Sequence, residues 1–452
     1  MAGRFHLVTL GCPKNAVDSD KIAAALGADG LVPTDDVHAA DIVVVNTCAF
    51  IEDARRESVD TILALADVKA DDARLVVTGC MAERYGDELA DALPEADAVI
   101  GFEGAGTIAG AITPVILSRR RGVAADAPVG VRDLLELPRA APSAPWAYLK
   151  VAEGCDRACA FCAIPSFRGK QRSRTPDSIV TEARALVEGG ARELVLVAQD
   201  LAWYGRDAGE VGALAPLLRR LDRELAADGL ARVRLLYLYP SEVKDPLVST
   251  MLELDTVVPY FDLSLQHAAR GLLARMARWG SGDRFLDAIS SIRAQAPDAA
   301  FRSSFIVGFP GETEADHDEL LAFLDAAALD WAGLFPYSPE EGTAAVELDG
   351  TVPGALVAER IRECEERQTA ITQAARDALC ADAAALSVLV DGEADGQAVG
   401  RTHREAPEID GVVFVEVADG DPTPAPGTIV DAVATEALGP DLYARVVAGV
   451  TR

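Results

Sequence analysis

The chain has 452 residues, enough for two or three domains with sizeable hydrophobic cores. Its 42 Lys and Arg stand against 72 Asp and Glu, a net charge of −30. That charge is unusual for a protein that binds nucleic acid and would attract a basic protein partner, although an Asp- and Ala-rich proteome would explain it equally well. No apolar run could span a bilayer, polar residues come too early for a signal peptide, and eight cysteines are too few for a disulfide scaffold. We therefore expect a soluble, cytoplasmic protein without a membrane partner.

Residues 1–112 alternate apolar strands with helical stretches such as 52–68 and 81–93, the pattern of a parallel α/β domain. Three strand-like runs each end directly before a cysteine: residues 7–11 before Cys12, residues 43–47 before Cys48 and residues 75–79 before Cys80. Open parallel sheets bind ligands at the carboxyl ends of their strands, so the three thiols could converge there. Free cysteine is often only a small core residue, but the repetition at this edge favours a ligand role.

Residues 113–145 are predicted to be a connector with little regular structure. They contain three consecutive arginines followed by four prolines, namely Arg119, Arg120, Arg121, Pro128, Pro138, Pro142 and Pro145. The arginine run is interpreted as solvated surface.

Residues 146–380 repeat strand and helix over a longer stretch. Strands are predicted at 146–152, 193–199, 233–239, 259–265, 301–308 and 331–337, with helices such as 179–188, 213–226 and 314–327 between them. Six such repeats favour a partial (β/α)6 barrel, whose chemistry would lie in the loops after the strands. A helix from Pro353 to about Ala385 closes this part, and its Cys364 and Cys380 have no ligand spacing, so we expect them to be structural.

The loop after the first barrel strand carries the most informative pattern, Cys155, Cys159 and Cys162 spaced as C-x3-C-x2-C. Three thiolates can hold three irons of a cubane cluster, and no fourth Cys or His lies near enough in sequence to close the site. An iron without a protein ligand can bind a small molecule. A bacterial electron-carrying ferredoxin would add nearby cysteines and a Cys-Pro, and structural zinc would require four ligands. The triplet therefore favours an open-site cluster.

Residues 381–452 change to short strands at 387–390, 412–415 and 428–430, separated by turn residues, which favours a small β-barrel. Such barrels often bind oligonucleotides. This one has four arginines against thirteen Asp and Glu, a net charge of −9, so docking of a protein is more plausible than binding of RNA.

The cysteine loop after the first strand of a partial barrel resembles that of the radical S-adenosylmethionine (SAM) enzymes. With the three cysteines of the first domain and the terminal barrel, nearly the whole chain resembles the methylthiotransferase family, which joins an N-terminal cluster domain, a radical-SAM barrel and a TRAM domain. Residues 10–15, 162–169, 265–267 and 401–411 resemble the branch that modifies a ribosomal protein. The tRNA branch typically has Gln-Met where this chain has Pro13 and Lys14, and more usually Ser at the position of His267.

That resemblance implies methylthiolation of the β-carbon of an aspartate in small-subunit ribosomal protein twelve, with two SAM molecules per turnover. It implies two 4Fe–4S clusters, one on Cys12, Cys48 and Cys80 and one on Cys155, Cys159 and Cys162. The second cluster would cleave SAM to a radical that abstracts hydrogen from the unactivated carbon, while the first would carry the sulfur that is methylated and transferred. An electron donor such as flavodoxin or ferredoxin would supply the reducing electrons.

Further site residues are expected on the same resemblance, and no side chain is assigned a catalytic role. Phe161 would pack near the adenine of SAM or anchor its loop, and Gln199 would contact the methionyl end. The remaining candidates for contact with cofactor or substrate are Gln266, His267, Arg302 and Ser304, with Glu312 as a weaker one.

Three alternative functions are open to such a chain. A tRNA adenosine methylthiotransferase should have a basic groove, which the charges do not supply. An iron–sulfur electron-transfer or redox-sensing protein would leave the polar barrel-edge residues unexplained. A TRAM-type RNA-binding module with vestigial clusters is disfavoured by six intact cysteines, and contact with RNA is expected only through the ribosome.

Overall fold

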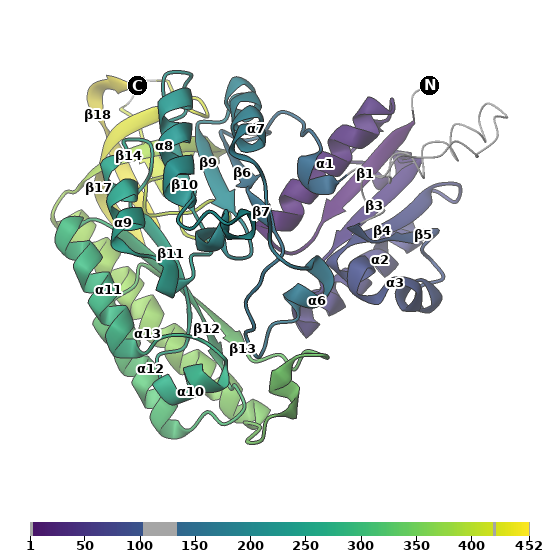
Figure 1. Ribbon diagram of the computed structural model, residues 1–452. Coiled ribbons are helices and arrows are strands. Elements are labelled where there is room, and N and C mark those ends of the chain that lie inside the picture. Colours follow the sequence, from purple (N-terminus) through teal and green to yellow (C-terminus); the bar gives the residue numbers. More distant parts are fainter. Residues whose placement is uncertain (1–2, 103–132, 419–421, 452) are drawn as a thin grey trace.

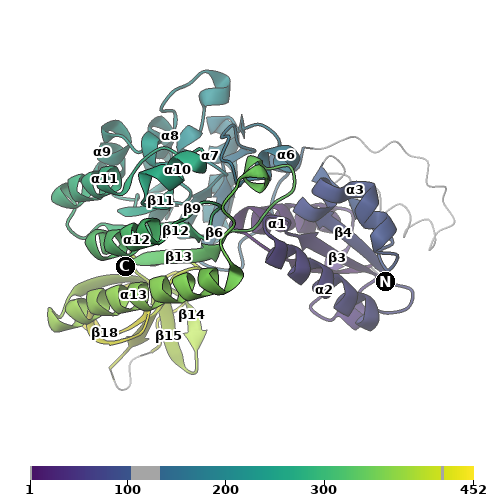
Figure 2. The same cartoon turned by 90° about the horizontal axis from the view of Figure 1, so that it is seen from below.

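The computed structural model describes residues 3–102, 133–418 and 422–451 (Figure 1). The predicted arginine run at 119–121, Pro128 and most of the predicted connector lie outside these residues. Three parts follow one another along the chain, and Figure 2 shows the first and the last of them packed against different sides of the central part. No helix among the described residues is long and apolar enough to cross a membrane.

The N-terminal part is the predicted parallel α/β domain, with strand order β2-β1-β3-β4-β5. Its strands are β1 (Arg4–Thr9), β2 (Val32–Pro33), β3 (Ile42–Thr47), β4 (Arg74–Gly79) and β5 (Ala98–Ile100). Its helices are α1 (Pro13–Ala28), η1 (Val37–Ala39), α2 (Glu52–Val68) and α3 (Cys80–Ala92). Every residue of the central strand β3 is buried, as expected for a parallel strand covered on both faces.

Alternate residues of β3 pack on opposite sides of this sheet. Val44 packs with Ile22 and Leu26 of α1, whereas Val43 and Val45 pack with residues of α2 and α3. Because β1, β3 and β4 are neighbours in the sheet, the cysteines that follow them leave it at adjacent carboxyl ends.

The central part is the predicted partial barrel of six parallel strands. They are β6 (Trp146–Lys150), β9 (Glu193–Val197), β10 (Arg232–Leu235), β11 (Tyr260–Gln266), β12 (Ala300–Val307) and β13 (Trp331–Pro336). Two three-stranded sheets, β10-β9-β6 and β11-β12-β13, are joined by parallel bridges from Val233 to Val257 and from Leu238 to Leu263. The barrel therefore has an open side between β6 and β13.

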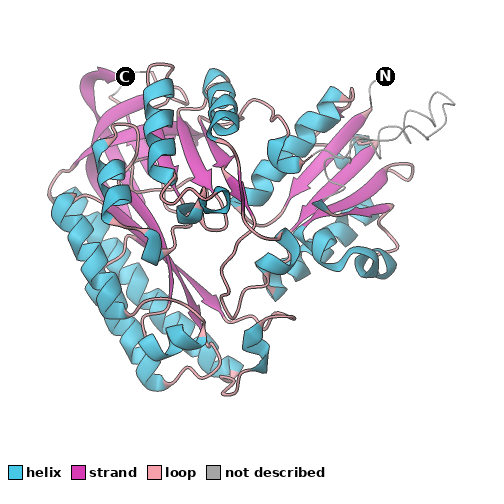
Figure 3. Cartoon of the chain, in the orientation of Figure 1, coloured by secondary structure: helices cyan, strands magenta, loops and turns pink. Residues whose placement is uncertain are grey.

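Helices cover the outside of this barrel, as the separation of cyan helices from magenta strands in Figure 3 makes plain. They are α7 (Pro176–Glu188), α8 (Leu214–Leu225), α9 (Asp245–Glu253), α11 (Gly282–Gln295) and α12 (Glu314–Ala327). Shorter elements lie in the loops: η2 (Leu134–Glu136), β7 (Ala152–Glu153), α6 (Ile164–Arg168), β8 (Arg172–Ser173), η3 (Leu201–Trp203), η4 (Arg206–Ala208), η5 (Pro240–Glu242), α10 (Arg270–Arg275) and η6 (Ala344–Glu347).

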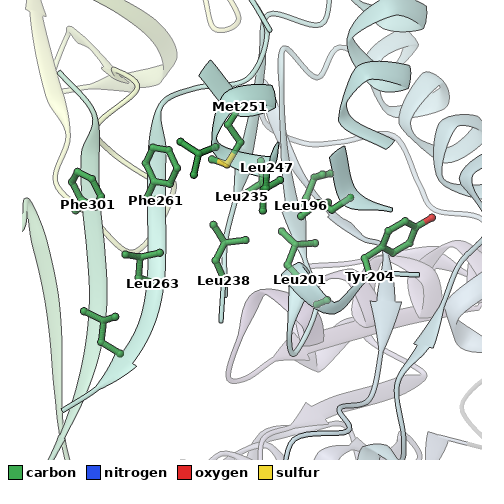
Figure 4. Close-up of a cluster of buried hydrophobic side chains, with 14 of the residues drawn as sticks. Leu196, Leu201, Tyr204, Leu235, Leu238, Leu247, Met251, Phe261, Leu263 and Phe301 are labelled. Atoms are coloured by element: carbon green, nitrogen blue, oxygen red, sulfur yellow. The ribbon is translucent and has the colours of Figure 1, made fainter. Parts of the chain in front are cut away.

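The main core lies between the strands and these helices. Figure 4 shows Leu235, Leu238 and Leu263 of the barrel near Leu247 and Met251 of α9. Full burial of one such side chain contributes about 1.5–3 kcal/mol. On β12 the buried residues alternate with half-buried ones, so Arg302 and Ser304 lie on the opposite face of the strand from Phe301 and Phe305. Arg302 and Ser304 therefore face the barrel lumen.

The long helix α13 (Gly354–Ala381) ends four residues earlier than predicted, and Ala383, with φ +46°, cannot continue it. It leads into the predicted small barrel, which is closed in the order β14-β15-β16-β18-β17. The strands are β14 (Ala385–Ala394), β15 (Gln397–Arg401), β16 (Val413–Glu416), β17 (Ile429–Leu438) and β18 (Asp441–Thr451). Strands β15 and β18 were missed by the sequence reading because pairing with neighbouring strands, rather than a clear local pattern, defines them.

The C-terminal part also closes the amino end of the central barrel. Ala406 lies in an apolar cluster with Tyr148 of β6, Tyr260 of β11 and Val17 of α1. Arg401 forms an ion pair of 2.9 Å with the fully buried Glu193 at the start of β9. All three parts therefore meet around the barrel lumen.

Candidate functional site

Cys12, Cys48 and Cys80 lie at the carboxyl edge of the N-terminal sheet. Two tight glycine turns bring them there. Gly11 has φ +91°, and a Cβ on it would lie 2.9 Å from the Sγ of Cys48. Gly79 has φ +92°, and a Cβ on it would lie 2.6 Å from the carbonyl oxygen of Thr47. Only glycine allows the chain to turn this closely around the first trio of cysteines.

Burial and nearby charges act differently on the three thiols of this trio. Burial raises the pKa of Cys12, but the positive charges of Lys14 and Arg168 outweigh it and leave that pKa lowered. Burial raises the pKa of Cys48 to about 12 and also raises the pKa of Cys80, although Arg168 opposes the shift at Cys80. Metal ligation requires thiolates, so a bound cationic centre and Arg168 would together stabilise the charges that burial disfavours.

The second trio, Cys155, Cys159 and Cys162, lies in the loop that follows β7. Gly154 has φ +79°, and a Cβ on it would lie 2.1 Å from the carbonyl oxygen of Lys170, so the loop requires glycine there. All three cysteines are half-buried, whereas Cys48 and Cys80 of the first trio are buried. Burial raises the pKa of Cys155 to about 11 and that of Cys162 to about 12.

Backbone hydrogen bonds hold the second trio's loop from several sides. Cys155 N–H donates to the carbonyl of Gly169 at 3.1 Å, and Ala160 N–H donates to the carbonyl of Met276 at 2.9 Å. The carbonyl of Ala160 accepts from Ala345 N–H at 2.9 Å. The loop is therefore anchored to segments distant in sequence, which preorganises its thiols.

The donor set fits a cubane iron–sulfur cluster in each trio. In residues 3–102, 133–418 and 422–451, no three His, Cys, Asp or Glu side chains surround a single point as the ligands of one ion do. A cubane takes one thiolate per iron, so its ligands surround a larger volume. Soft thiolates suit such clusters, and three of them leave one iron open. Cys364 is fully buried in the barrel core and Cys380 packs beside the small barrel, so neither completes a trio.

Arg168 links the first trio to the start of the second trio's loop. Its guanidinium lies 3.0 Å from the Sγ of Cys80 and 2.5 Å from the Oδ1 of Asn15, and it donates to Glu153 at 2.8 Å. Glu153 also accepts from Lys150 at 2.7 Å and directly precedes Gly154 and Cys155. Burial raises the pKa of Glu153, but Arg168 and Lys150 outweigh it and hold that pKa well below its usual range. A half-buried anion thus lies between two buried cations at the start of the second trio's loop.

Two of the predicted cofactor contacts lie near this network. The side-chain amide of Gln199 donates to Glu153, and its Oε1 has no hydrogen-bond partner among the described residues. Phe161 is half-buried and packs against the barrel core within the cysteine loop. Both positions are compatible with contact to a molecule bound beside the second trio.

Other predicted contacts lie along β11 and β12. Gln266 ends β11 with φ +75°, a strained value of the kind that often marks functional sites. Arg302 is half-buried and forms ion pairs with Asp262 at 3.2 Å and Asp410 at 3.5 Å. Ser304 follows on the same face of β12. Arg302 therefore holds protein carboxylates in this structure.

His267 and Glu312 are placed apart from that group. His267 is fully buried, its Nδ1 accepts from the N–H of Ala269 at 3.1 Å, and burial lowers its pKa to about 4. Glu312 is buried and accepts from Arg360 of α13 at 2.9 Å. The charged neighbours of His267 include Asp316 and Arg360, so it faces α12 and α13. Its role as a cofactor contact stays a prediction.

Sequence reasoning missed several cations that line the site. The guanidinium of Arg157 lies 3.9 Å from the centroid of the Trp203 ring and 3.8 Å from that of Tyr239, and it pairs with Asp200 at 2.7 Å. Arg278 lies 3.4 Å from the Sγ of Cys159. Arg157 stands inside the C-x3-C loop, which could have marked it, whereas nothing local marks Arg278.

Three known families match successive parts of the chain. Residues 4–101 match the family described as Uncharacterized protein family UPF0004, residues 149–324 match the Radical SAM superfamily, and residues 384–447 match the TRAM domain. These ranges coincide with the N-terminal sheet, most of the partial barrel and the small closed barrel.

Relatives of the whole chain carry the name ribosomal protein uS12 methylthiotransferase RimO. The protein from Salinispora tropica is 43% identical, over 98% of this chain and 95% of its own length. That from Cutibacterium acnes is 43% identical over 97% of both chains. That from Moorella thermoacetica is 45% identical over 93% of this chain and 94% of its own.

Solved structures share the fold at low sequence identity. The radical SAM methyltransferase TsrM from Kitasatospora setae, with cobalamin and a 4Fe–4S cluster bound, superposes with a TM-score of 0.52 at 15% identity, over 75% of this chain and 77% of TsrM. The same enzyme with tryptophan and a SAM analogue gives 0.51 at 15% identity, over 74% of both chains. This likeness concerns the fold alone.

Proposed function

Because the chain belongs to the RimO family of ribosomal protein uS12 methylthiotransferases, we propose that it transfers a methylthio group to the β-carbon of an aspartate in small-subunit ribosomal protein twelve. The predicted membership of the methylthiotransferase family is confirmed by these full-length relatives. The observation that carries the proposal is that Arg168 contacts both Cys80 of the first trio and Glu153, which stands two residues before Cys155 of the second.

The β C–H bond of aspartate is unactivated, so neither a general base nor an ordinary nucleophile can functionalise it. Two 4Fe–4S clusters and SAM supply the carbon radical that removes this hydrogen and the methylthio group that replaces it. We propose Cys12, Cys48 and Cys80 as ligands of one cluster and Cys155, Cys159 and Cys162 as ligands of the other.

The chain's own residues orient the reactants around these ligands. The anchored loop of the second trio presents its thiols at the barrel mouth, and the ring of Phe161 is available to pack against an adenine. The free Oε1 of Gln199 can accept a hydrogen bond from the amino group of a bound SAM. The ion pair of buried Arg168 with half-buried Glu153 lies between Cys80 and the start of the second trio's loop. Their role is to position the groups and to limit access of water.

Charge supports a basic protein substrate. The net charge of −30 would attract ribosomal proteins, which are usually basic. The proposed substrate places the enzyme in the cytoplasm, and a small reduced carrier such as flavodoxin or ferredoxin would deliver its electrons.

The proposal is tested by anaerobic reconstitution of the clusters, followed by incubation with reductant, SAM and either the ribosomal protein or unmodified tRNA. We expect mass spectrometry to find a methylthio addition on an aspartate of the protein. Addition to tRNA alone would transfer the assignment to the tRNA branch. Formation of neither product, with no 5′-deoxyadenosine, would contradict a radical-SAM role.

A further inference from the structure

The charged side chains between the two cysteine trios are, with one exception, paired within the described protein. Arg168 and Lys150 share Asp18 and Glu153, Arg157 pairs with Asp200 and Glu242, and Arg302 pairs with Asp262 and Asp410. Arg278 donates to the carbonyl of Ser264 and contacts the Sγ of Cys159. These cations have partners already and are not free to bind a further anion strongly.

Lys14 is the exception. Its side chain is 7% exposed, and its Nζ lies 3.5 Å from the centroid of the Tyr237 ring at the carboxyl end of β10. In the portion of the chain that the structure describes, this ammonium donates no hydrogen bond and has no carboxylate within ion-pair distance. The nearby sulfur of Cys12 is a proposed cluster ligand. This ammonium has the face of the Tyr237 ring on one side and no carboxylate partner, so it can bind an anion that arrives from outside.

The surroundings of Lys14 are rigid. Tyr237 has φ +65°, and its N–H donates to Asp262 at 2.9 Å, which holds the ring in place beneath the ammonium. Lys14 itself lies in the first turn of the 16-residue helix α1, whose amino end adds partial positive charge. It stands two residues beyond Cys12 and contacts Tyr237 of the barrel, so it lies where the N-terminal domain meets the barrel.

We propose that the ammonium of Lys14 binds the side-chain carboxylate of the aspartate that is modified. This inference rests on the proposed function and adds how the substrate is recognised. In aspartate the carboxylate carbon is bonded directly to the β-carbon, so a fixed carboxylate places the reacting carbon within one bond of a fixed point. A substrate held in this way would have its β-carbon near Cys12, a proposed ligand of the cluster that would supply the methylthio group.

The inference is tested by a double-mutant cycle between Lys14 and the target carboxylate. Cluster-loaded wild-type enzyme and its Lys14→Met variant are each titrated, with SAM present, against the ribosomal protein and against a variant of it with asparagine at the modified position. We expect the wild-type enzyme to bind the aspartate form about 10- to 100-fold more tightly than the asparagine form. We expect Lys14→Met to lose this preference while binding the asparagine form as the wild type does, and Lys14→Arg to restore part of it.

Iron content and the cluster spectra check that the variants are loaded. If Lys14 had a purely structural role, Lys14→Met would bind both substrates more weakly by the same factor and would keep the preference for the aspartate form. That result would overturn the inference. If the Lys14→Met variant does not load its clusters, the wild-type enzyme still tests the inference. Equal affinity of the wild type for the aspartate and asparagine forms of the ribosomal protein would overturn it. Failure of the proposed function is distinguishable, since wild-type enzyme would then leave the ribosomal protein without a methylthio group.

Discussion

The guanidinium of Arg168 lies 3.0 Å from the Sγ of Cys80 and 2.8 Å from the carboxylate of Glu153, so one side chain of α6 links the first trio to the residue at the start of the second trio's loop. Arg168 is 8% exposed, and its pKa is raised well above its usual value because Glu153 and Cys80 outweigh the effect of burial. A permanently charged, forked donor suits this position, since it contacts a thiol and a carboxylate together.

Replacement of Arg168 by methionine should therefore damage both stability and the first cluster. The change leaves Glu153 and Asp18 with less compensation in a buried site, and loss of one partner of a buried pair costs about 3–5 kcal/mol. We expect denaturant unfolding to show a loss of this order and iron analysis to show weaker retention of the cluster at Cys80. The exposed Arg172, which pairs with Asp133 at the surface, provides the control: Arg172→Met should change stability by about 1 kcal/mol or less. Equal effects of the two substitutions would contradict the role given to Arg168.

Substitution of Cys48 by alanine should separate the two halves of the reaction. Removal of one ligand of the first trio should lower bound iron from about eight to about four per chain, because each cubane holds four irons. We expect reductive cleavage of SAM to 5′-deoxyadenosine to persist and methylthio transfer to be lost. Cys380, which is half-buried and belongs to neither trio, supplies the control variant Cys380→Ser with both activities intact. Methylthio product from a Cys48→Ala enzyme that lacks the first cluster would refute the division of labour.

Glu340 links the barrel to the N-terminal domain and should set the distance between the trios. It is 2% exposed and forms ion pairs with Arg55 and with Arg84, the latter at 2.7 Å. The Glu340→Gln variant keeps the shape but removes the charge. We expect methylthio product to fall about 10-fold or more while 5′-deoxyadenosine formation continues, because a small misplacement of reacting groups costs about 100-fold in rate.

The neighbouring Glu341 is the matched control for the ion pairs of Glu340 with Arg55 and Arg84. Its side chain is exposed and only its backbone carbonyl accepts from Arg84, so Glu341→Gln leaves that contact in place. If both variants gave the same ratio of methylthio product to 5′-deoxyadenosine as the wild type, the ion pairs of Glu340 would have no role in positioning the trios.

Burial of His267 should make stability depend on pH. Its pKa falls from 6.5 to about 4 on folding, so between these values the unfolded chain binds more protons than the folded one. Stability from this residue is present above 6.5 and is lost as the pH falls toward 4. We expect a loss of about 2 kcal/mol from this residue between about pH 7 and about pH 5.

The measurement is chemical denaturation of wild type and a His267→Asn variant across that range. Asparagine can accept the hydrogen bond from Ala269 but does not titrate, so the difference between the two proteins isolates the histidine. The variant should have the shallower slope. Parallel pH profiles would show that His267 does not enter the folded state as a neutral, buried group.

Local patterns predicted much of the architecture. The sequence of α12 is a clear case: Thr313 and Asp316 form a capping box at its start, and its bounds agree with the predicted 314–327. The run at 43–47 was predicted as a strand of a parallel sheet, and β3 occupies this position with every residue buried. These features are readable because helix and strand periodicities, caps and turn glycines act over a few residues.

The sequence by itself determined the family and the order of the three parts, and it predicted the six cysteines as ligands, because each rests on residues that are close together or that recur at the ends of predicted strands. Only the tertiary structure decided what lies between the trios. Arg168 meets Cys80 across 88 positions of the chain, Arg84 meets Glu340 across 256, and Lys14 meets Tyr237 between two domains. Such contacts depend on how the domains pack, and no periodicity of the chain records that packing. For the same reason, the buried ammonium of Lys14 became a candidate for substrate recognition only once the barrel and the N-terminal domain were seen together.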